Sequence, residues 1–231
     1  AAGVEKLLVA DLPPHVPVSR IVDVEQAEGI AQFVAMMALR HARGLEAYEA
    51  LQRERTWKRR PVAAVRSRVA VLGTGHMGGA IMRVLAAVGF DVVGWNRRDG
   101  GALGDVLPSA DIVVCALPLT PQTEGLLDAR AFARMRSGSY LINVARGAHV
   151  VEADLIDAVR SGRLAGAALD VQRREPMPAD DPLWTVPGIT VTPHIAAQSS
   201  PRTIATQFVA GLRCVERGEP PPQVVDRARG Y

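Results

Sequence analysis

The sequence predicts an α/β fold with a doubly wound parallel sheet, and three observations point to this class. From residue 68 onward, short apolar runs alternate with segments of helical periodicity. Such alternation requires crossover connections, and these make neighbouring strands parallel. Hydrophobic residues make up 48% of the chain but aromatic residues only 4%, so small aliphatic side chains must fill the core, as in a sheet covered by helices.

The first element is expected over residues 24–57. Apolar side chains recur there at helical spacing, for example at Ile30, Val34, Met37 and Leu45. The pattern predicts one long amphipathic helix. Its length favours a bridge between two lobes or two subunits, and a single surface helix is equally compatible with the periodicity.

The later elements follow in alternation after Pro61. Strands are expected at residues 68–73, 90–96, 110–118, 139–145, 165–171 and 189–194. Helices are expected at residues 77–88, 129–136, 152–161 and 201–217, and the third of these opens on acidic residues that suit a helix N-terminus.

Composition argues against several classes of protein. The net charge is +3, and the one basic run, Lys58 to Arg60, has no interleaved aromatic residues of the kind that single-strand binders use. No stretch reaches the roughly 18 apolar residues of a membrane span. Cys115 and Cys214 form no metal-ligand spacing, and we expect both to be reduced core residues. The expectation is a cytoplasmic protein without a metal, a nucleic-acid partner or a membrane partner.

A glycine-rich turn follows the first expected strand. Gly73-Thr74-Gly75-His76-Met77-Gly78 matches GxGxxG and opens directly into a helix. In this context Gly73 permits the tight turn, Gly75 lets the backbone approach a pyrophosphate, and Gly78 allows close packing of helix on strand. The turn predicts dinucleotide binding in a Rossmann fold, with His76 and Met77 in contact with the cofactor.

The end of the second expected strand bears on the choice of cofactor. It reads Asn96-Arg97-Arg98 and lacks a carboxylate where a ribose 2′-hydroxyl would bind. Two arginines there can bind a 2′-phosphate, which favours NADP over NAD. The alternative is a pair of solvated loop arginines.

Three polar residues follow later strand ends, where open α/β sheets bind ligands. Arg146 lies in Asn143-Val144-Ala145-Arg146-Gly147, Glu175 follows Asp170-Val171, and His194 lies in Thr192-Pro193-His194-Ile195-Ala196. Singly, each has an ordinary structural explanation. Together with the glycine turn they resemble the D-isomer-specific 2-hydroxyacid dehydrogenase family, particularly its glyoxylate and hydroxypyruvate reductases, over nearly the whole chain.

This resemblance implies a separate role in the reaction for each of the three residues. Reduction of a 2-oxo acid places negative charge on the carbonyl oxygen and requires a proton there. His194 would supply the proton, Glu175 would hold the imidazole, and Arg146 would polarise the carbonyl and clamp the carboxylate. The resemblance also assigns Pro118, Ala145, Asp170 and Ala196 to the nicotinamide site, and it assigns Ala2 and Gly3 to the substrate carboxylate.

The resemblance further implies a domain plan. Members of the family carry additional βα units before the carboxylate-binding segment, so we expect only part of a flavodoxin-like substrate domain. The expected units are residues 1–23 as a remnant of that domain, residues 24–197 as the dinucleotide-binding domain with the long helix, and residues 198–231 as a helix and tail returning to the substrate domain. The long helix commonly packs across a dimer interface in the family, which implies a homodimer.

The leading hypothesis is therefore an NADPH-dependent reductase of glyoxylate, hydroxypyruvate or a similarly small 2-oxo acid. Another member of the family, using NAD or acting on a different 2-hydroxy acid, is the nearest alternative. A third hypothesis is a nucleotide-sensing binding protein of the corepressor type, in which the same fold serves recognition.

Overall fold

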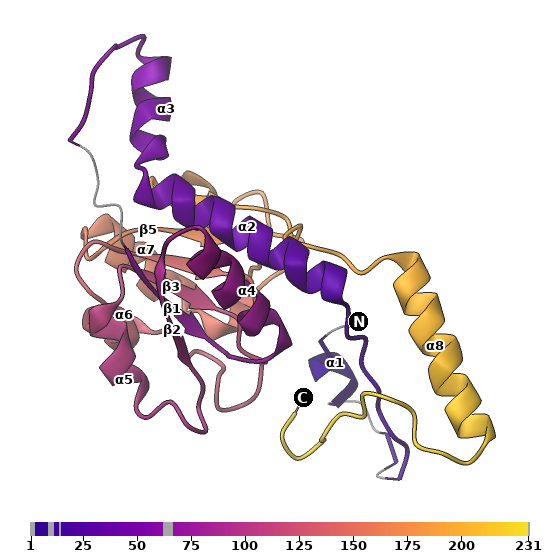
Figure 1. The fold of residues 1–231 in the computed structure, drawn as a ribbon. Helices are drawn as coiled ribbons and strands as arrows, with labels where there is room; N and C mark the ends of the chain where they lie inside the picture. The colour runs from indigo at the N-terminus through magenta and orange to yellow at the C-terminus, as the bar shows by residue number, and fades with distance from the viewer. Residues whose placement is uncertain (1–2, 9–11, 14, 62–66, 231) are drawn as a thin grey trace.

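A parallel sheet of six strands forms the centre of the molecule (Figure 1). The computed structural model describes residues 3–8, 12–13, 15–61 and 67–230. The strands lie in the order β2-β1-β3-β4-β5-β6, and every neighbouring pair is parallel. The order reverses between β1 and β3, and open α/β sheets bind ligands in the crevice at such a point. The predicted α/β class with a doubly wound sheet is confirmed.

The bounds of the elements are as follows. The strands are β1 (Arg68–Leu72), β2 (Asp91–Trp95), β3 (Ile112–Cys115), β4 (Ser139–Asn143), β5 (Leu164–Leu169) and β6 (Ile189–Val191). The helices are α1 (Glu5–Leu8), α2 (Val24–Ala42), α3 (Leu45–Arg53), α4 (His76–Ala87), α5 (Leu103–Val106), α6 (Ala129–Arg134), α7 (Glu152–Arg160) and α8 (Pro201–Glu216). Short 3-10 turns are η1 (Leu107–Ser109), η2 (Gly147–His149) and η3 (Pro182–Thr185).

Helices cover both faces of the sheet because successive strand residues point to opposite sides. On β1, Val69 and Val71 pack into a core with α2 and α4. Ala70 and Leu72 pack into the other core, with α6 and α7. All four side chains are fully buried, which explains why this strand is a continuous apolar run rather than an alternating one.

The single helix expected over residues 24–57 is two helices, so that prediction is wrong. Gly44 adopts a left-handed backbone (φ 63°) and ends the first helix, and α3 then projects away from the sheet (Figure 1). Arg40 ties the two helices together, since its guanidinium donates to Glu49 of α3 (Nη2 to Oε2, 2.7 Å) and to Thr190 of β6 (3.2 Å). No residue of α3 is buried, whereas several apolar residues of α2 are. One continuous apolar pattern in the sequence therefore corresponds to a helix packed on the core and a helix that is not.

The two cysteines differ in environment. Cys115 is buried in β3, and burial raises the pKa of its thiol to about 12, so it is a protonated core residue as expected. Cys214 lies on α8, which stands apart from the sheet and has no buried residue (Figure 1). Its side chain is only half-buried, so the expectation of a core position is wrong for Cys214. Both cysteines are free.

The C-terminal tail returns to the N-terminal segment. Val225 donates its backbone N–H to the carbonyl of Val18 (2.8 Å), and both side chains share a small apolar cluster with Val4. Gln207 of α8 both donates to and accepts from the backbone of Val22. These contacts join the segment before α2 to the segment after the sheet. No helix in the described part of the chain has the length and apolar character needed to cross a bilayer.

Candidate active site

The glycine turn lies at the switch point of the sheet, where α4 begins. Gly73 has a positive φ of 102°, and a Cβ there would lie 2.5 Å from the carbonyl oxygen of Ala116. A Cβ on Gly78 would lie 1.7 Å from the carbonyl oxygen of Gly73, so only glycine lets the helix start directly on the turn. Gly75 caps α4, and no described atom lies within 4 Å of where its Cβ would be. Backbone N–H groups and the helix dipole are thus presented to an open face, which suits a pyrophosphate.

His76 and Met77, expected to contact a cofactor, differ in position. His76 is the exposed first residue of α4. Met77 packs its side chain against the core shared with α2. The contacts of both residues with a cofactor stay predictions.

The loop after β2 is shaped by Asn96. Its Oδ1 accepts hydrogen bonds from the backbone N–H groups of Arg98 (3.0 Å) and Asp99 (2.9 Å), and its Nδ2 donates to Thr74 of the glycine turn (3.3 Å). Arg97 and Arg98 are both exposed. The residues present therefore fit a dinucleotide that carries a 2′-phosphate beside the ribose.

Glu175 and His194 are in direct contact beyond the ends of β5 and β6. Nδ1 of His194 lies 2.9 Å from Oε2 of Glu175, while Oε1 of Glu175 accepts the backbone N–H of Gln172 (3.0 Å). Partial burial raises the pKa of Glu175, but the bonds from His194 and Gln172 and the charges of His194 and Arg146 outweigh it, so the pKa lies below its ordinary value. Glu175 is therefore a carboxylate at neutral pH, which fixes one side of the imidazole.

Asp170 holds the loop that carries His194. The residue is 1% exposed, and its side chain accepts hydrogen bonds from Thr192 Oγ1 (2.6 Å) and from the backbone N–H groups of Ile195 (2.9 Å) and Ala196 (2.8 Å). His194 itself has a left-handed backbone with φ 56°, a conformation that costs a histidine roughly 1–3 kcal/mol and persists only where its surroundings impose it. The buried carboxylate of Asp170 supplies that constraint.

Arg146 lies on the turn after β4, next to the turn that carries Glu175. The two turns can meet because the residue after Arg146 is glycine. A Cβ on Gly147 would lie 1.9 Å from the backbone carbon of Gln172. Arg146 acts on Glu175 through its charge, and its Nε contacts Glu5 Oε1 at 2.5 Å. The three residues expected to be catalytic thus share one edge of the sheet.

The remaining expected site residues lie around this edge. Pro118 is half-buried in the loop that follows β3, and its carbonyl accepts a hydrogen bond from Thr123 (2.8 Å). Ala145 is buried, and its carbonyl accepts from Arg146 (2.8 Å). Gly3 lies against the guanidinium of Arg146. Ala2, expected to bind the substrate carboxylate, lies outside the described residues.

Two site neighbours escaped the sequence reasoning. His149 is completely buried, with Nδ1 3.0 Å from the carbonyl oxygen of Arg146 and Nε2 3.3 Å from that of Pro118. Burial lowers the pKa of His149, and the charge of Arg146 adds to this effect. Glu5 is the other, through its contact with Arg146. The available signal for His149 was a histidine three positions after Arg146 in the same turn, and for Glu5 it was a carboxylate two positions after Gly3 in the expected carboxylate-binding segment.

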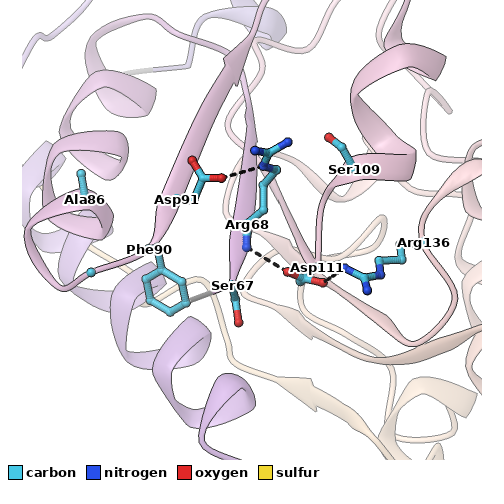
Figure 2. A pocket seen from close by; sticks show the side chains of 9 residues that line it. Ser67, Arg68, Ala86, Phe90, Asp91, Ser109, Asp111 and Arg136 are labelled. Carbon is cyan, nitrogen blue, oxygen red and sulfur yellow. Dashed lines mark hydrogen bonds and ion pairs between the residues drawn. The ribbon is translucent and has the colours of Figure 1, made fainter. Parts of the chain in front are cut away.

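A hollow of about 610 Å³ lies elsewhere, at the amino ends of the strands. Figure 2 shows its charged side chains: Arg68 donates to Asp91 (Nε to Oδ2, 2.7 Å), and Asp111 accepts from the backbone of Arg68 and from Arg136 (2.6 Å). These charges are paired with one another. The hollow is also at the sheet edge opposite to the one where open α/β sheets carry their chemistry. Among the described residues, no group of three or more His, Cys, Asp or Glu side chains could hold a metal ion.

Comparison with known proteins gives consistent matches. A family model described as "D-isomer specific 2-hydroxyacid dehydrogenase, NAD binding domain" matches residues 35–196. The chain is 36% identical to "Glyoxylate/hydroxypyruvate reductase A" of Serratia proteamaculans (strain 568) over 248 residues, which cover 100% of this chain and 79% of that relative.

Solved structures match at the level of the whole fold. One is a D-isomer specific 2-hydroxyacid dehydrogenase from Xanthobacter autotrophicus Py2 in complex with NADPH and MES, with a TM-score of 0.94, 44% identity and 100% of both chains covered. Another is the NADPH-dependent glyoxylate/hydroxypyruvate reductase of Sinorhizobium meliloti in complex with NADP and sulfate, with a TM-score of 0.94, 35% identity, and coverage of 100% of this chain and 78% of that one.

Proposed function

The chain belongs to the D-isomer specific 2-hydroxyacid dehydrogenase family, and we propose that it reduces glyoxylate, hydroxypyruvate or a similarly small 2-oxo acid with NADPH. The observation that carries this proposal is the 2.9 Å contact between His194 and Glu175 at the same edge of the sheet as the glycine turn. The printed names of the relatives support the substrate class, and the NADPH and NADP bound in similar structures support the cofactor.

The cofactor would occupy the switch point. When bound, NADPH supplies a hydride to the carbonyl carbon of the substrate. The groups that would hold it are the glycine turn, the loop after β2 and the strand-end residues around the nicotinamide: Gly73, Gly75, His76, Met77, Gly78, Asn96, Arg97, Arg98, Pro118, Ala145, Asp170 and Ala196.

His194 would donate the proton. Glu175 accepts from Nδ1 of the ring, so Nε2, on the opposite side, is the nitrogen available to protonate the carbonyl oxygen as negative charge develops there. The carboxylate of Glu175 stabilises the charged imidazole before transfer and holds the ring in one orientation afterwards. In the oxidation direction the neutral ring would accept the same proton.

Arg146 would bind the substrate through its planar guanidinium. A 2-oxo acid presents a carboxylate and a carbonyl oxygen side by side, and a guanidinium has parallel N–H groups that match such a pair of oxygens. The backbone of Gly3, which lies against this guanidinium, would bind the carboxylate from the other side together with Ala2. A small substrate is thus held at both of its polar ends.

The test is NADPH oxidation by the purified protein with glyoxylate and with hydroxypyruvate. We expect turnover with both, and we expect His194→Ala to abolish it while leaving NADPH binding intact. The matched control is His15→Ala, which removes an exposed histidine from a turn in the N-terminal segment. Turnover retained by His194→Ala would show that the proton comes from another group.

Other outcomes of the same experiment separate the alternatives. Turnover with NADH but not NADPH would contradict the cofactor assignment, and turnover only with a larger 2-oxo acid would contradict the substrate assignment. Tight NADPH binding without turnover on any 2-oxo acid would favour nucleotide sensing, a reading that the comparisons do not support.

We also propose a homodimer in which α3 and the segment after it contact a second copy. Support comes from the exposure of this arm, where Leu45 is 47% and Trp57 is 99% exposed, and from its projection away from the sheet (Figure 1). Large exposed apolar side chains on a projecting arm are typical of an interface. Sedimentation should report a dimer that Trp57→Ser with Leu45→Ser converts to monomer, and a wild-type monomer would contradict the proposal.

We also propose a division into domains and a cytoplasmic location. The contact of Val225 with Val18 supports assigning residues 1–23 and 198–231 to one substrate unit beside the dinucleotide unit of residues 24–197. Two free cysteines are typical of the reducing cytoplasm.

A further inference from the structure

The guanidinium of Arg146 is held by a residue that lies far away in the sequence. Its Nε contacts Oε1 of Glu5 at 2.5 Å, and Nη1 donates to the carbonyl of Ala145 (2.8 Å). Glu5 opens α1, 141 positions before Arg146. Both side chains are partly buried, with 32% of Arg146 and 26% of Glu5 exposed. The contact therefore joins the N-terminal segment to the turn after β4.

The backbone beside Glu5 encloses the same guanidinium. A Cβ on Gly3 would lie 1.7 Å from Nη2 of Arg146, so the main chain of Gly3 packs directly on the planar group. Glu5 touches one corner of the guanidinium, Ala145 a second, and Gly3 lies against a third. An arginine held at three corners loses most of the rotamer freedom that a solvated arginine has.

The contacts leave donors for a ligand. A guanidinium carries five N–H groups, and the bonds to Glu5 and Ala145 use the Nε–H and one Nη1–H. The remaining N–H groups belong to the two Nη atoms, which are the pair that can bind two substrate oxygens in parallel. The bond from Nε to Glu5 therefore fixes the direction in which the two Nη atoms of Arg146 point.

A single ion pair that water still reaches typically contributes little to folding, so a role in folding alone does not account for a carboxylate placed on this arginine. The effect of the position of Arg146 on the reaction is larger, because a displacement of about 1 Å in a substrate-binding group can cost roughly 100-fold in rate. The orientation of Arg146 matters more to the reaction than to the fold.

We propose that Glu5 is a positioning residue for the reduction, holding Arg146 through Nε so that its Nη atoms face the substrate beside the backbone of Gly3. The inference rests on the proposed function of Arg146. Because Glu5 belongs to the proposed substrate unit and Arg146 to the proposed dinucleotide unit, their contact also aligns the two halves of the carboxylate site.

Two substitutions separate hydrogen bonding from charge. Glu5→Gln keeps an oxygen that can accept from Nε but removes the charge, whereas Glu5→Ala removes both. For Glu5→Ala we expect kcat/KM for glyoxylate to fall by roughly 30-fold with a raised KM. For Glu5→Gln we expect a fall of about threefold or less. Binding of NADPH should not change in either variant, since the contact of Glu5 is with Arg146, which is proposed to bind the substrate rather than the cofactor. The control is Glu219→Ala, which removes the glutamate of an exposed pair with Arg217 (2.7 Å) and should have no effect on kcat/KM.

A second readout does not depend on turnover. The Nε–H of Arg146, assigned in a ¹⁵N spectrum by its loss in Arg146→Lys, should be protected from exchange in the wild type and in Glu5→Gln and unprotected in Glu5→Ala. If the wild type shows no turnover but this pattern holds, the proposed function fails while Glu5 still positions Arg146. An unprotected wild-type Nε–H, unchanged kinetics in Glu5→Ala, or equal damage from both substitutions would overturn the positioning role.

Discussion

Replacing Asp170 by alanine should lower both stability and turnover, because this buried carboxylate organises the loop of His194. It accepts three hydrogen bonds, from Thr192 (2.6 Å), Ile195 (2.9 Å) and Ala196 (2.8 Å). A hydrogen bond to a charged group contributes about 1.5–3 kcal/mol, so three give roughly 4.5–9 kcal/mol as an upper limit. Ile195 is 55% exposed, so water reaches part of the released loop, and we expect a loss of about 3 kcal/mol in the free energy of unfolding.

The effect on turnover follows from the backbone of His194. Its left-handed conformation (φ 56°) is retained while Asp170 anchors the residues on both sides of it. Once the loop relaxes, the 2.9 Å contact of His194 with Glu175 is lost for much of the time. We therefore expect kcat to fall by about 100-fold, with a smaller change in the affinity for NADPH.

The assay combines urea unfolding, followed by circular dichroism, with steady-state oxidation of NADPH. Asp170→Asn keeps the shape but points an amide at backbone N–H groups, so it should lose stability to an intermediate degree. Exposed Asp180 provides the control, Asp180→Ala. If Asp170→Ala unfolds within about 1 kcal/mol of wild type and keeps kcat within about twofold, then the loop is held by other contacts and the reasoning is refuted.

Three further predictions follow from other parts of the structure. Changing Arg97 and Arg98 together to alanine should weaken NADPH binding by about 100-fold, the loss of two charge-assisted bonds, and NADH binding by about threefold or less; fluorescence titration would measure both, and equal weakening would contradict a 2′-phosphate site. Because burial lowers the pKa of His149 in the folded state, the unfolded chain binds the extra proton, so the free energy of unfolding should fall as pH drops below about 6.5. Urea unfolding across that range should show a flatter profile for His149→Phe, and identical slopes would be evidence against the assignment. Gly78→Ala, whose Cβ would lie 1.7 Å from a carbonyl oxygen of the turn, should destabilise the protein and abolish NADPH binding; Gly79→Ala, which meets no described atom within 4 Å, should be neutral or stabilising by up to about 1 kcal/mol, and similar melting temperatures for the two variants would argue against the tight turn.

The sheet was predictable from sequence because its signal is local. Each strand is a short apolar run that ends in a turn, and all six appear where they were expected, with ends shifted by a few residues. The break at Gly44 was not predictable in the same way. A glycine inside an amphipathic pattern is compatible with a continuing helix, and the bonds from Arg40 that hold α3 in its new direction join residues of α3 and β6 that no local pattern connects.

The same contrast between local signals and three-dimensional contacts applies to the candidate site. Arg146, Glu175 and His194 could be proposed because each follows a strand, and parallel strands bring their carboxyl ends to one edge. Glu5 and His149 could not, since their importance lies in contacts with Arg146 and Pro118 that depend on three-dimensional packing. Gly147 is an intermediate case. The sequence shows a glycine after Arg146, but the reason for it is the close backbone of Gln172 in the turn after β5.

The position of β2 places the residues that would select the cofactor away from those that would transfer the proton. β2 is one of the two edge strands of the sheet, and the exposed side chains of Arg97 and Arg98 follow it, whereas His194, Glu175 and Asp170 follow strands on the other side of the switch point. Substitutions at the rim after β2 do not enter either core. The choice between phosphorylated and unphosphorylated cofactor can therefore change, in evolution or by engineering, without altering the groups that we propose to transfer the proton.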